Sequence, residues 1–108
     1  KPGQSSAEIA ERVVRARQVQ RDRFAASGED IFCNAAMNNR QIEKFCTLSK
    51  ECKDLLERII EKMGLSARAC TRIIKLARTI ADLAASDNIQ PEHIAEAASY
   101  RILDRQNF

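Results

Sequence analysis

The stretch that decides the fold is GLSARACTRIIKLARTIADL, residues 64–83. Its apolar residues recur every three or four positions, which is the spacing that places side chains on one face of an α-helix. We expect Ser66 to cap this helix, because a serine oxygen can accept a hydrogen bond from a free N–H group of the first turn. The predicted inner arc holds Ile73, Leu76, Ala77, Ile80, Leu83 and Ala84.

The opposite arc of this helix is a polar stripe with an unusual distribution of charge. At about 100° per residue, its members fall within about 40° of Arg68 on a helical wheel. They are Arg68, Arg72, Lys75, Thr79 and Asp82. The stripe is basic at the N-terminal end and acidic at the C-terminal end, the reverse of what the helix dipole favours, and each misplaced charge costs about 0.3–1 kcal/mol.

Further helices are predicted on both sides of this stretch. Ser5 and Glu8 form a capping-box pattern, and the helix that follows runs to about residue 26. Its expected inner face consists of Ile9, Val13, Ala16 and Phe24, flanked by Val19. Ser27 and Gly28 end it.

The middle and the end of the chain contain three more predicted elements. In residues 29–38, a loop or short helical turn is expected to bury Ile31, Phe32 and Met37. Asn38 or Asn39 is then expected to cap a short helix that ends at Phe45 and turns Ile42 and Phe45 inward. Ser49 begins a helix whose apolar positions are Leu55, Leu56, Ile59, Ile60 and Met63, with Gly64 at its end. Pro91 begins the last helix, which fades after Leu103 and turns inward Ile94, Ala97, Ala98 and Tyr100 with Ile102. The predicted fold is a small all-α bundle of four to five helices, one domain over residues 1–108, with residues 1–4 as a linker end.

Composition limits the functions that this chain can have. It has 108 residues, three glycines, no Trp and a net charge of +3, which is mildly basic. Three scattered glycines cannot form a phosphate-binding loop, so catalysis by this chain alone is not expected. No apolar run approaches the length of a membrane span and no signal peptide is visible, so we expect a cytoplasmic protein. Because the chain begins at Lys1 rather than Met, we expect it to be a fragment or a processed chain.

Four cysteines and one histidine are the candidate metal ligands. Cys33, Cys46, Cys52 and Cys70 form no C-x-x-C pair, and His93 is remote from them in the sequence. Zinc sites usually contain closely spaced ligand pairs. We therefore interpret the cysteines as small, reduced packing residues, with a metal site and a disulfide or redox role as alternatives. His93 is interpreted as an exposed residue of a first helical turn.

The misplaced arginines indicate a site for an anion. A helix N-terminus offers free N–H groups and the positive end of a dipole, and arginine can bind two phosphate oxygens at once. An arginine that is unfavourable for the helix is therefore well placed for a phosphate. Arg68 is the first candidate and Arg72 the second; the alternative is that Arg68 is a solvated residue, paired with Glu57 or Glu61.

The first helix is rich in arginine. Residues 12–23 include five arginines and one acid, Asp22. The arginines are Arg12, Arg15, Arg17, Arg21 and Arg23. Three interpretations are open: the arginines form a solvated face, they contact a neighbouring subunit or domain, or they bind a nucleic-acid backbone. The interspersed acids Glu8, Glu11 and Asp22 weaken the nucleic-acid interpretation.

Three segments together resemble a known family. They are SSAEIAERVVRARQVQRDRF, GLSARACTRIIKLARTIADL and NIQPEHIAEAASYRILDR. The sequence resembles the C-terminal domain of Mg-chelatase-like AAA+ ATPases, the ComM/YifB group, over nearly its whole length. The run SARA..RI.K.ARTIADL is the most specific part, and residues 28–49 are less distinctive.

This resemblance implies a helical lid that follows an AAA+ nucleotide-binding core. It implies a parent ATPase that binds ATP and Mg²⁺ and assembles into a homo-oligomeric ring, expected to be a hexamer. Competence-linked members of the group act on DNA as branch-migration helicases. The position of Arg68 matches the sensor-2 arginine of such lids, which contacts the γ-phosphate of ATP, and Arg72 is the second choice. Arg78 is expected to form a salt bridge inside the lid or to the core. The fragment alone binds no cofactor, because most of the nucleotide site lies elsewhere.

Two other functions compete with the lid. One is a helical nucleic-acid-binding module that uses the arginine-rich first helix. The other is a protein-interaction domain, because NIQPEHIAEAA resembles the end of histone-like folds. We interpret the similarity to histone-like folds as a feature that many helices share, since Pro at the first helical position is frequent.

Overall fold

The computed structural model describes the backbone of residues 5–106 and the side chains of residues 5–100. It contains α1 (Ser6–Ala26), the short 3₁₀ turn η1 (Asn34–Ala36), α2 (Asn39–Phe45), α3 (Lys50–Met63), α4 (Ala67–Leu83) and α5 (Pro91–Gln106). No strand occurs in residues 5–106, so the predicted all-α class is confirmed. The predicted linker end lies outside the described residues. The last helix was expected to fade after Leu103, but its backbone stays helical to Gln106.

The predicted helix boundaries are confirmed at the caps. Ser5 and Glu8 form the reciprocal capping box of α1, and Asn38 and Gln41 form the same arrangement at α2. Ser49 and Ser66 cap α3 and α4 with their hydroxyl oxygens. Gly64 ends α3 in the left-handed conformation, with φ of 62°, which a residue with a Cβ atom adopts only at a cost.

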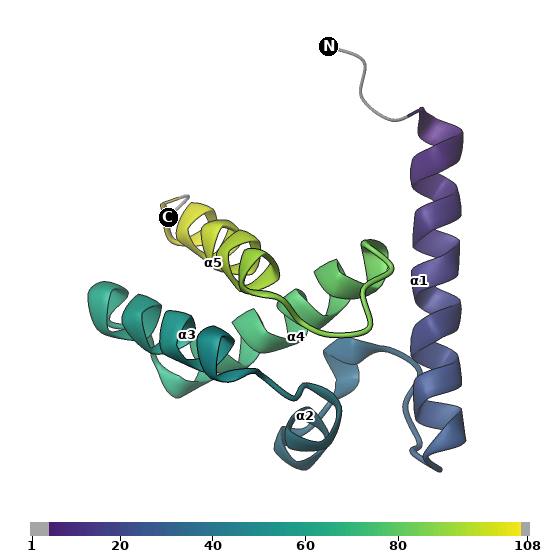
Figure 1. Ribbon diagram of the computed structural model, residues 1–108, viewed down its shortest axis with the longest axis horizontal. Helices are drawn as coiled ribbons and strands as arrows, with labels where there is room; N and C mark the ends of the chain where they lie inside the picture. The colour runs from purple at the N-terminus through teal and green to yellow at the C-terminus, as the bar shows by residue number, and fades with distance from the viewer. Residues whose placement is uncertain (1–4, 107–108) are drawn as a thin grey trace.

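Helix α4 is the centre of the fold. It packs against α5, α1, η1 and α2, and α3 packs against α5 (Figure 1). The fully buried side chains Phe24, Ile73 and Ile94 come from α1, α4 and α5, so these three helices share one hydrophobic core. Phe24 also meets Phe45 of α2 edge to face, with ring centroids 5.1 Å apart.

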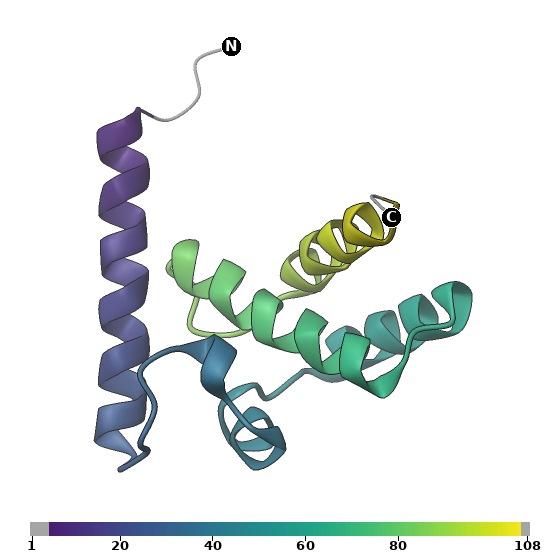
Figure 2. The same cartoon turned by 180° about the vertical axis from the view of Figure 1, so that it is seen from behind.

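Helix α1 is packed only along its C-terminal part. Figures 1 and 2 show its first turns projecting past the other helices. The Cα radius of gyration is 14.4 Å, above the value of about 13 Å expected for a compact chain of this length. Ala16 and Phe24 are buried as predicted, but Ile9 is 49% exposed, because no element covers that end of the helix. Val19 is 41% exposed for a different reason: it lies about 100° around the helix from the side that Ala16, Gln20 and Phe24 bury.

Several other burial predictions are wrong. Phe32 is 73% exposed and Tyr100 is 47% exposed, although both were expected to face inward. Ala84 is also exposed, because α4 ends before it and the chain turns there toward α5. Met37 and Ile42 are buried as predicted. The side chain of Ile102 lies outside the described side chains.

No helix in the described part of the chain is long and apolar enough to cross a membrane.

Glu29 holds the loop after α1 against α2. Its Oε1 accepts hydrogen bonds from Arg40 Nη2 at 2.9 Å and from Gln41 Nε2 at 2.8 Å, and its Oε2 lies 3.6 Å from Lys44 Nζ. The hydrogen bond from Gln41, followed by that from Arg40 and the two positive charges, lowers the pKa of Glu29 from its ordinary value of 4.5 to about 2.

We predict that Ile73→Ala lowers the free energy of unfolding by about 2–5 kcal/mol, the range for large-to-small changes in a core. Ile73 is completely buried at the centre of α4. Urea denaturation measures the loss. Val14→Ala is the control, because Val14 is 65% exposed and its truncation removes little buried surface. Equal losses for the two variants would contradict the described core.

We also predict a pH-dependent contribution from Glu29. Because its pKa is lowered in the folded chain, the charged form stabilises the fold above the unfolded value of 4.5, and the stabilisation disappears as the pH falls toward about 2. The difference in urea midpoint between wild type and Glu29→Gln should therefore shrink over that interval. A difference that stays constant with pH would show that the carboxylate is not held by this contact.

Candidate functional site

The N-terminal end of α4 is the candidate site. Ser66 Oγ accepts a hydrogen bond of 3.1 Å from the backbone N–H of Ala69, as predicted for the cap. Thr71 Oγ1 donates to the carbonyl oxygen of Ala67 at 3.0 Å, which fixes its side chain along the helix. This end of the helix is exposed at Ala67 and Arg68, so its free N–H groups face open space rather than the core.

Arg68 and Arg72 project from this end into an open hollow beside the start of α2. Both side chains are exposed, and neither makes a hydrogen bond or ion pair within the described residues. The suggested pairing of Arg68 with Glu57 or Glu61 is absent from those residues. The hollow is lined by Asn39, Ala67, Arg68, Thr71, Arg72 and Lys75.

The hollow presents hydrogen-bond donors and positive charge, and no carboxylate lines it among the described residues. Lys75 lies at its far side, where Nζ donates to the carbonyl oxygen of Ala35 at 3.0 Å. Two guanidinium groups about one turn apart can bind two oxygens each of an oxyanion. The arrangement is suited to binding a phosphate group.

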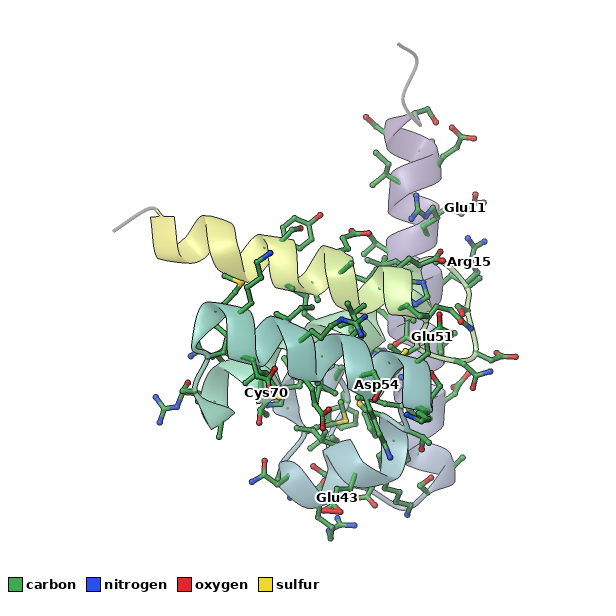
Figure 3. The ribbon with its side chains drawn as sticks, turned by 60° about the vertical axis from the view of Figure 1, so that its left-hand side comes forward. Glu11, Arg15, Glu43, Glu51, Asp54 and Cys70 are labelled. Carbon is green, nitrogen blue, oxygen red and sulfur yellow. The ribbon has the colours of Figure 1, made fainter. Side chains whose placement is uncertain are left out.

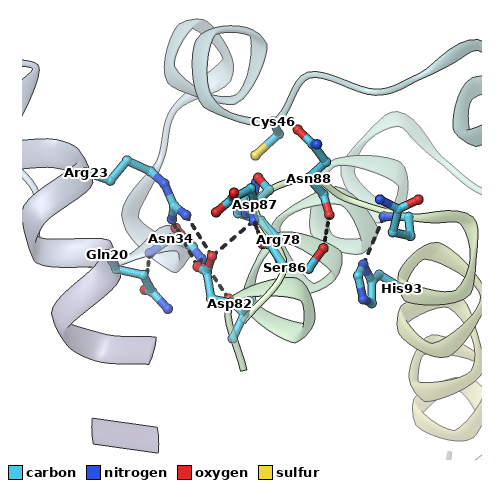
Figure 4. Close-up of polar contacts among 12 residues, drawn as sticks. Gln20, Arg23, Asn34, Cys46, Arg78, Asp82, Ser86, Asp87, Asn88 and His93 are labelled. Atoms are coloured by element: carbon cyan, nitrogen blue, oxygen red, sulfur yellow. Dashed lines mark hydrogen bonds and ion pairs between the residues drawn. The ribbon is translucent and has the colours of Figure 1, made fainter. Parts of the chain in front are cut away.

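The C-terminal end of the polar stripe of α4 packs against other elements of the fold. Asp82 and Thr79 do not continue a solvated stripe: Asp82 is 4% exposed and lies against α1 and η1. Arg23 binds both carboxylate oxygens of Asp82, at 2.7 and 3.0 Å, and Asn34 Nδ2 donates to Oδ2 at 2.9 Å (Figure 4). Asn34 Nδ2 also lies 3.1 Å from Thr79 Oγ1.

Arg78 completes this buried network from inside α4. It forms an ion pair with Asp82 at 3.1 Å, which confirms the expected salt bridge within the domain. Its guanidinium also donates to the carbonyl oxygens of Ser86 and Asp87, at 2.9 and 3.2 Å. These bonds hold the turn after α4, in which Ala85 has a φ of 57°. A left-handed alanine costs about 1–2 kcal/mol, so this turn depends on the contacts that Arg78 supplies.

The arginines of α1 divide into two groups. Arg12 Nε donates to the carbonyl oxygen of Leu83 at 3.2 Å, and Arg23 belongs to the buried network, so these two hold α1 against α4. Arg15, Arg17 and Arg21 are exposed. Sequence reasoning missed the structural group because it treated all five as one surface, although Arg12 and Arg23 lie near the buried face that includes Ala16 and Gln20.

His93 is buried, so the prediction of an exposed residue is wrong. Its Nδ1 accepts a hydrogen bond of 2.9 Å from the backbone N–H of Gln90, directly before α5 (Figure 4). His93 is the third residue of α5, the position from which a side chain can return to the capping residue. The run QPEH contains this signal, with Pro91 at the first helical position.

The cysteines lie in three different environments. Cys46 and Cys52 belong to the core, which confirms the packing interpretation for them, whereas Cys33 is exposed and Cys70 is partly covered. Burial raises the pKa of the Cys46 thiol to about 11 and also raises that of Cys70. Within the described residues, no three side chains of His, Cys, Asp or Glu lie close enough to hold a metal ion.

The fold and the hollow together define a small helical domain in which two exposed arginines stand at the start of α4. Residues 3–101 match the family described as magnesium chelatase, subunit ChlI C-terminal. The chain therefore belongs to this family, as the C-terminal domain found in ComM- and YifB-type proteins.

The similar proteins are much longer than this chain. Competence protein ComM of Haemophilus influenzae is 40% identical over 103 residues, which cover 95% of this chain and 19% of that protein. YifB of Escherichia coli is 42% identical over 104 residues, or 96% of this chain and 19% of that protein. YifB of Salmonella typhimurium is 40% identical over 103 residues. The chain thus spans about a fifth of the length of these relatives.

We predict that Asp82→Ala lowers the free energy of unfolding by about 3–5 kcal/mol, because it leaves two arginines without their buried partner. The side chain of Asp82 is 1% exposed in its pairs with Arg23 and Arg78. Asp54→Ala is the matched control, since it removes an exposed pair with Lys50 and should cost less than about 1 kcal/mol. Similar urea midpoints for the two variants would mean that the network contributes little.

Proposed function

We propose that this chain is the helical lid of a Mg-chelatase-like AAA+ ATPase, and that Arg68 contacts the γ-phosphate of ATP bound by another part of the same protein. The parent protein binds ATP and Mg²⁺, and this chain alone binds neither firmly. The observation that supports this most directly is the hollow at the start of α4, where Arg68 and Arg72 face open space beside donors and no carboxylate.

The charges at the start of α4 favour a phosphate ligand independently of family membership. Two cations at a helix N-terminus cost stability, and no described partner offsets that cost for Arg68 or Arg72. A phosphate placed there would be bound by the guanidinium groups and by the helix end. Arg68 is the first choice because it lies in the first turn of α4; Arg72 lies one turn further into the helix.

Further proposals concern the parent protein. The resemblance to the ComM/YifB group is our ground for proposing a homo-oligomeric ring, of six subunits, in the cytoplasm. The resemblance to the competence-linked members of this group is also our ground for proposing that the parent acts on DNA as a branch-migration helicase, and one of the similar proteins is called competence protein ComM. The lid would contribute to ATP hydrolysis at the interface between ring subunits.

The alternative, a nucleic-acid-binding module built on α1, has less support. Only Arg15, Arg17 and Arg21 remain for such a surface, because Arg12 and Arg23 are engaged on α4. Tight DNA binding by the isolated chain that weakens steeply with salt would favour this alternative. A protein-interaction domain with a histone-like end would instead dimerise through α5.

We predict that Arg68→Ala in the full-length protein lowers ATP turnover by about 10²–10³-fold, the range for removing one donor that stabilises transition-state charge. Nucleotide binding, measured with a fluorescent ATP analogue, should change much less. Turnover is measured with and without branched DNA, whose stimulation would support the helicase proposal.

The control for this experiment is Arg58→Ala, because Arg58 is an exposed arginine of α3 away from the hollow. It should leave turnover unchanged. If Arg68→Ala also leaves turnover unchanged, Arg68 is not the sensor, and Arg72→Ala becomes the decisive variant.

A further inference from the structure

Two further surfaces of the chain suggest a contact with another molecule; the second shares Arg72 and Lys75 with the hollow at Arg68. The first, the α1 tip, is an open hollow on the projecting turns of α1. Its lining residues are Ala7, Glu8, Ala10, Glu11 and Val14. The second, the α4 groove, lies between α4 and η1 and continues from the hollow at Arg68 toward the C-terminal end of α4. Its lining residues are Ala35, Arg72, Lys75, Leu76 and Thr79.

The α1 tip faces away from the rest of its own chain. The buried side of α1 is marked by Ala16, Gln20 and Phe24. On a helical wheel, Val14 lies about 120° from the centre of that side and Glu11 lies about 180° from it. Figure 3 shows Glu11 on the side of α1 turned away from the other helices, and Val14 is 65% exposed. The tip therefore cannot reach the α4 groove of the same copy without unfolding.

The α4 groove has the opposite charge and a similar apolar content. Arg72 and Lys75 supply two cations, and Ala35 and Leu76 supply an apolar floor. No carboxylate lines the groove among the described residues. The α1 tip combines two carboxylates with small apolar side chains, so the two surfaces are complementary in charge and in apolar character.

We propose that the α1 tip of one copy of this chain docks into the α4 groove of a second copy, with Glu11 beside Lys75. The same surfaces disfavour the other ways of pairing two copies. Two α1 tips would place carboxylates against carboxylates, and two α4 grooves would place cations against cations. The contact is therefore head-to-tail, and each copy keeps one unused surface for a further copy.

The contact is small, because the tip comprises only the first turns of one helix. Beyond Val14 the exposed side of α1 becomes basic, with Arg15, Arg17 and Arg21, and this limits the acidic surface to the projecting end. An interface of this size is below what holds a stable complex alone, so it acts together with contacts made elsewhere in the full-length protein.

The test is a charge exchange in the full-length protein, with self-association followed by sedimentation velocity. Glu11→Lys and Lys75→Glu should each raise the concentration of half-assembly at least about tenfold, which corresponds to about 1.4 kcal/mol. The double variant should restore association. An equimolar mixture of the two single variants should also associate, because each supplies the surface that the other has lost.

The mixture separates the possible outcomes. Restoration by the double variant but not by the mixture would mean that the two residues meet within one copy, which overturns the proposal. Unchanged association of both single variants, or loss that neither combination restores, would overturn it too. So would a wild-type protein that never associates. If Lys75→Glu removes binding of a DNA oligonucleotide and leaves self-association intact, the groove binds nucleic acid instead.

Two controls make the result specific. Glu57→Lys and Arg58→Glu reverse exposed charges on α3, outside both surfaces, and should leave association unchanged. Circular dichroism checks the fold of each variant; if Lys75→Glu fails to fold, Arg72→Glu replaces it in the same scheme. The proposal does not rest on the role of Arg68, because the readout is association and not ATP turnover.

Discussion

The position of α1 depends on one carboxylate. Asp82 stands near the C-terminal end of α4, where the helix dipole disfavours negative charge, and it is almost fully buried. Arg23, Arg78 and Asn34 each bind it, so the charge that is unfavourable for α4 becomes the point at which α1, η1 and α4 are joined. Each oxygen of Asp82 has two such partners, which offsets the cost of burying the charge, whereas Nε of Arg78 is buried without a hydrogen-bond partner among the described residues.

Both ends of α4 carry charges that are unfavourable for the helix dipole, and the two ends differ in what offsets them. At the C-terminal end, the misplaced charge is neutralised inside the domain by Arg23 and Arg78. At the N-terminal end, Arg68 and Arg72 have no described partner and face an open hollow. One end of the helix is a structural joint, and the other is a surface whose charge is available to a ligand. The same pattern in the sequence thus has two causes, and only burial distinguishes them.

Local signals carried most of what could be predicted. Caps such as Ser5, Asn38, Ser49 and Ser66, and the end at Gly64, are set by residues within a few positions, so the sequence alone located the helices. The all-α class followed from these helices. The position of Arg68 at an exposed helix start could also be predicted, because it depends on α4 alone.

Long-range packing could not be predicted in the same way. Arg23 and Asp82 are 59 positions apart, and the sequence around neither residue indicates that the two form an ion pair. The exposure of Ile9 has the same origin: periodicity shows that a helix has an apolar face, but not where its partner ends. Phe32 lies in the loop before η1, where no periodicity indicates which side chain is buried. The hydrogen bond of His93 could in principle have been predicted, because His93 follows Gln90 by three positions, the spacing at which a side chain returns to the backbone of the capping residue.

The partial packing of α1 has a mechanical consequence. The helix has 21 residues and is held on α4 at two points, by Arg23 on Asp82 and by Arg12 on the carbonyl oxygen of Leu83, so the turns before Arg12 form a short lever. Residues 6–11 span about 9 Å at 1.5 Å per residue, and a rotation of about 10° at Arg12 moves their end by about 1.5 Å. A change in the geometry at the C-terminal end of α4 is therefore passed on to the side chains at the far end of α1.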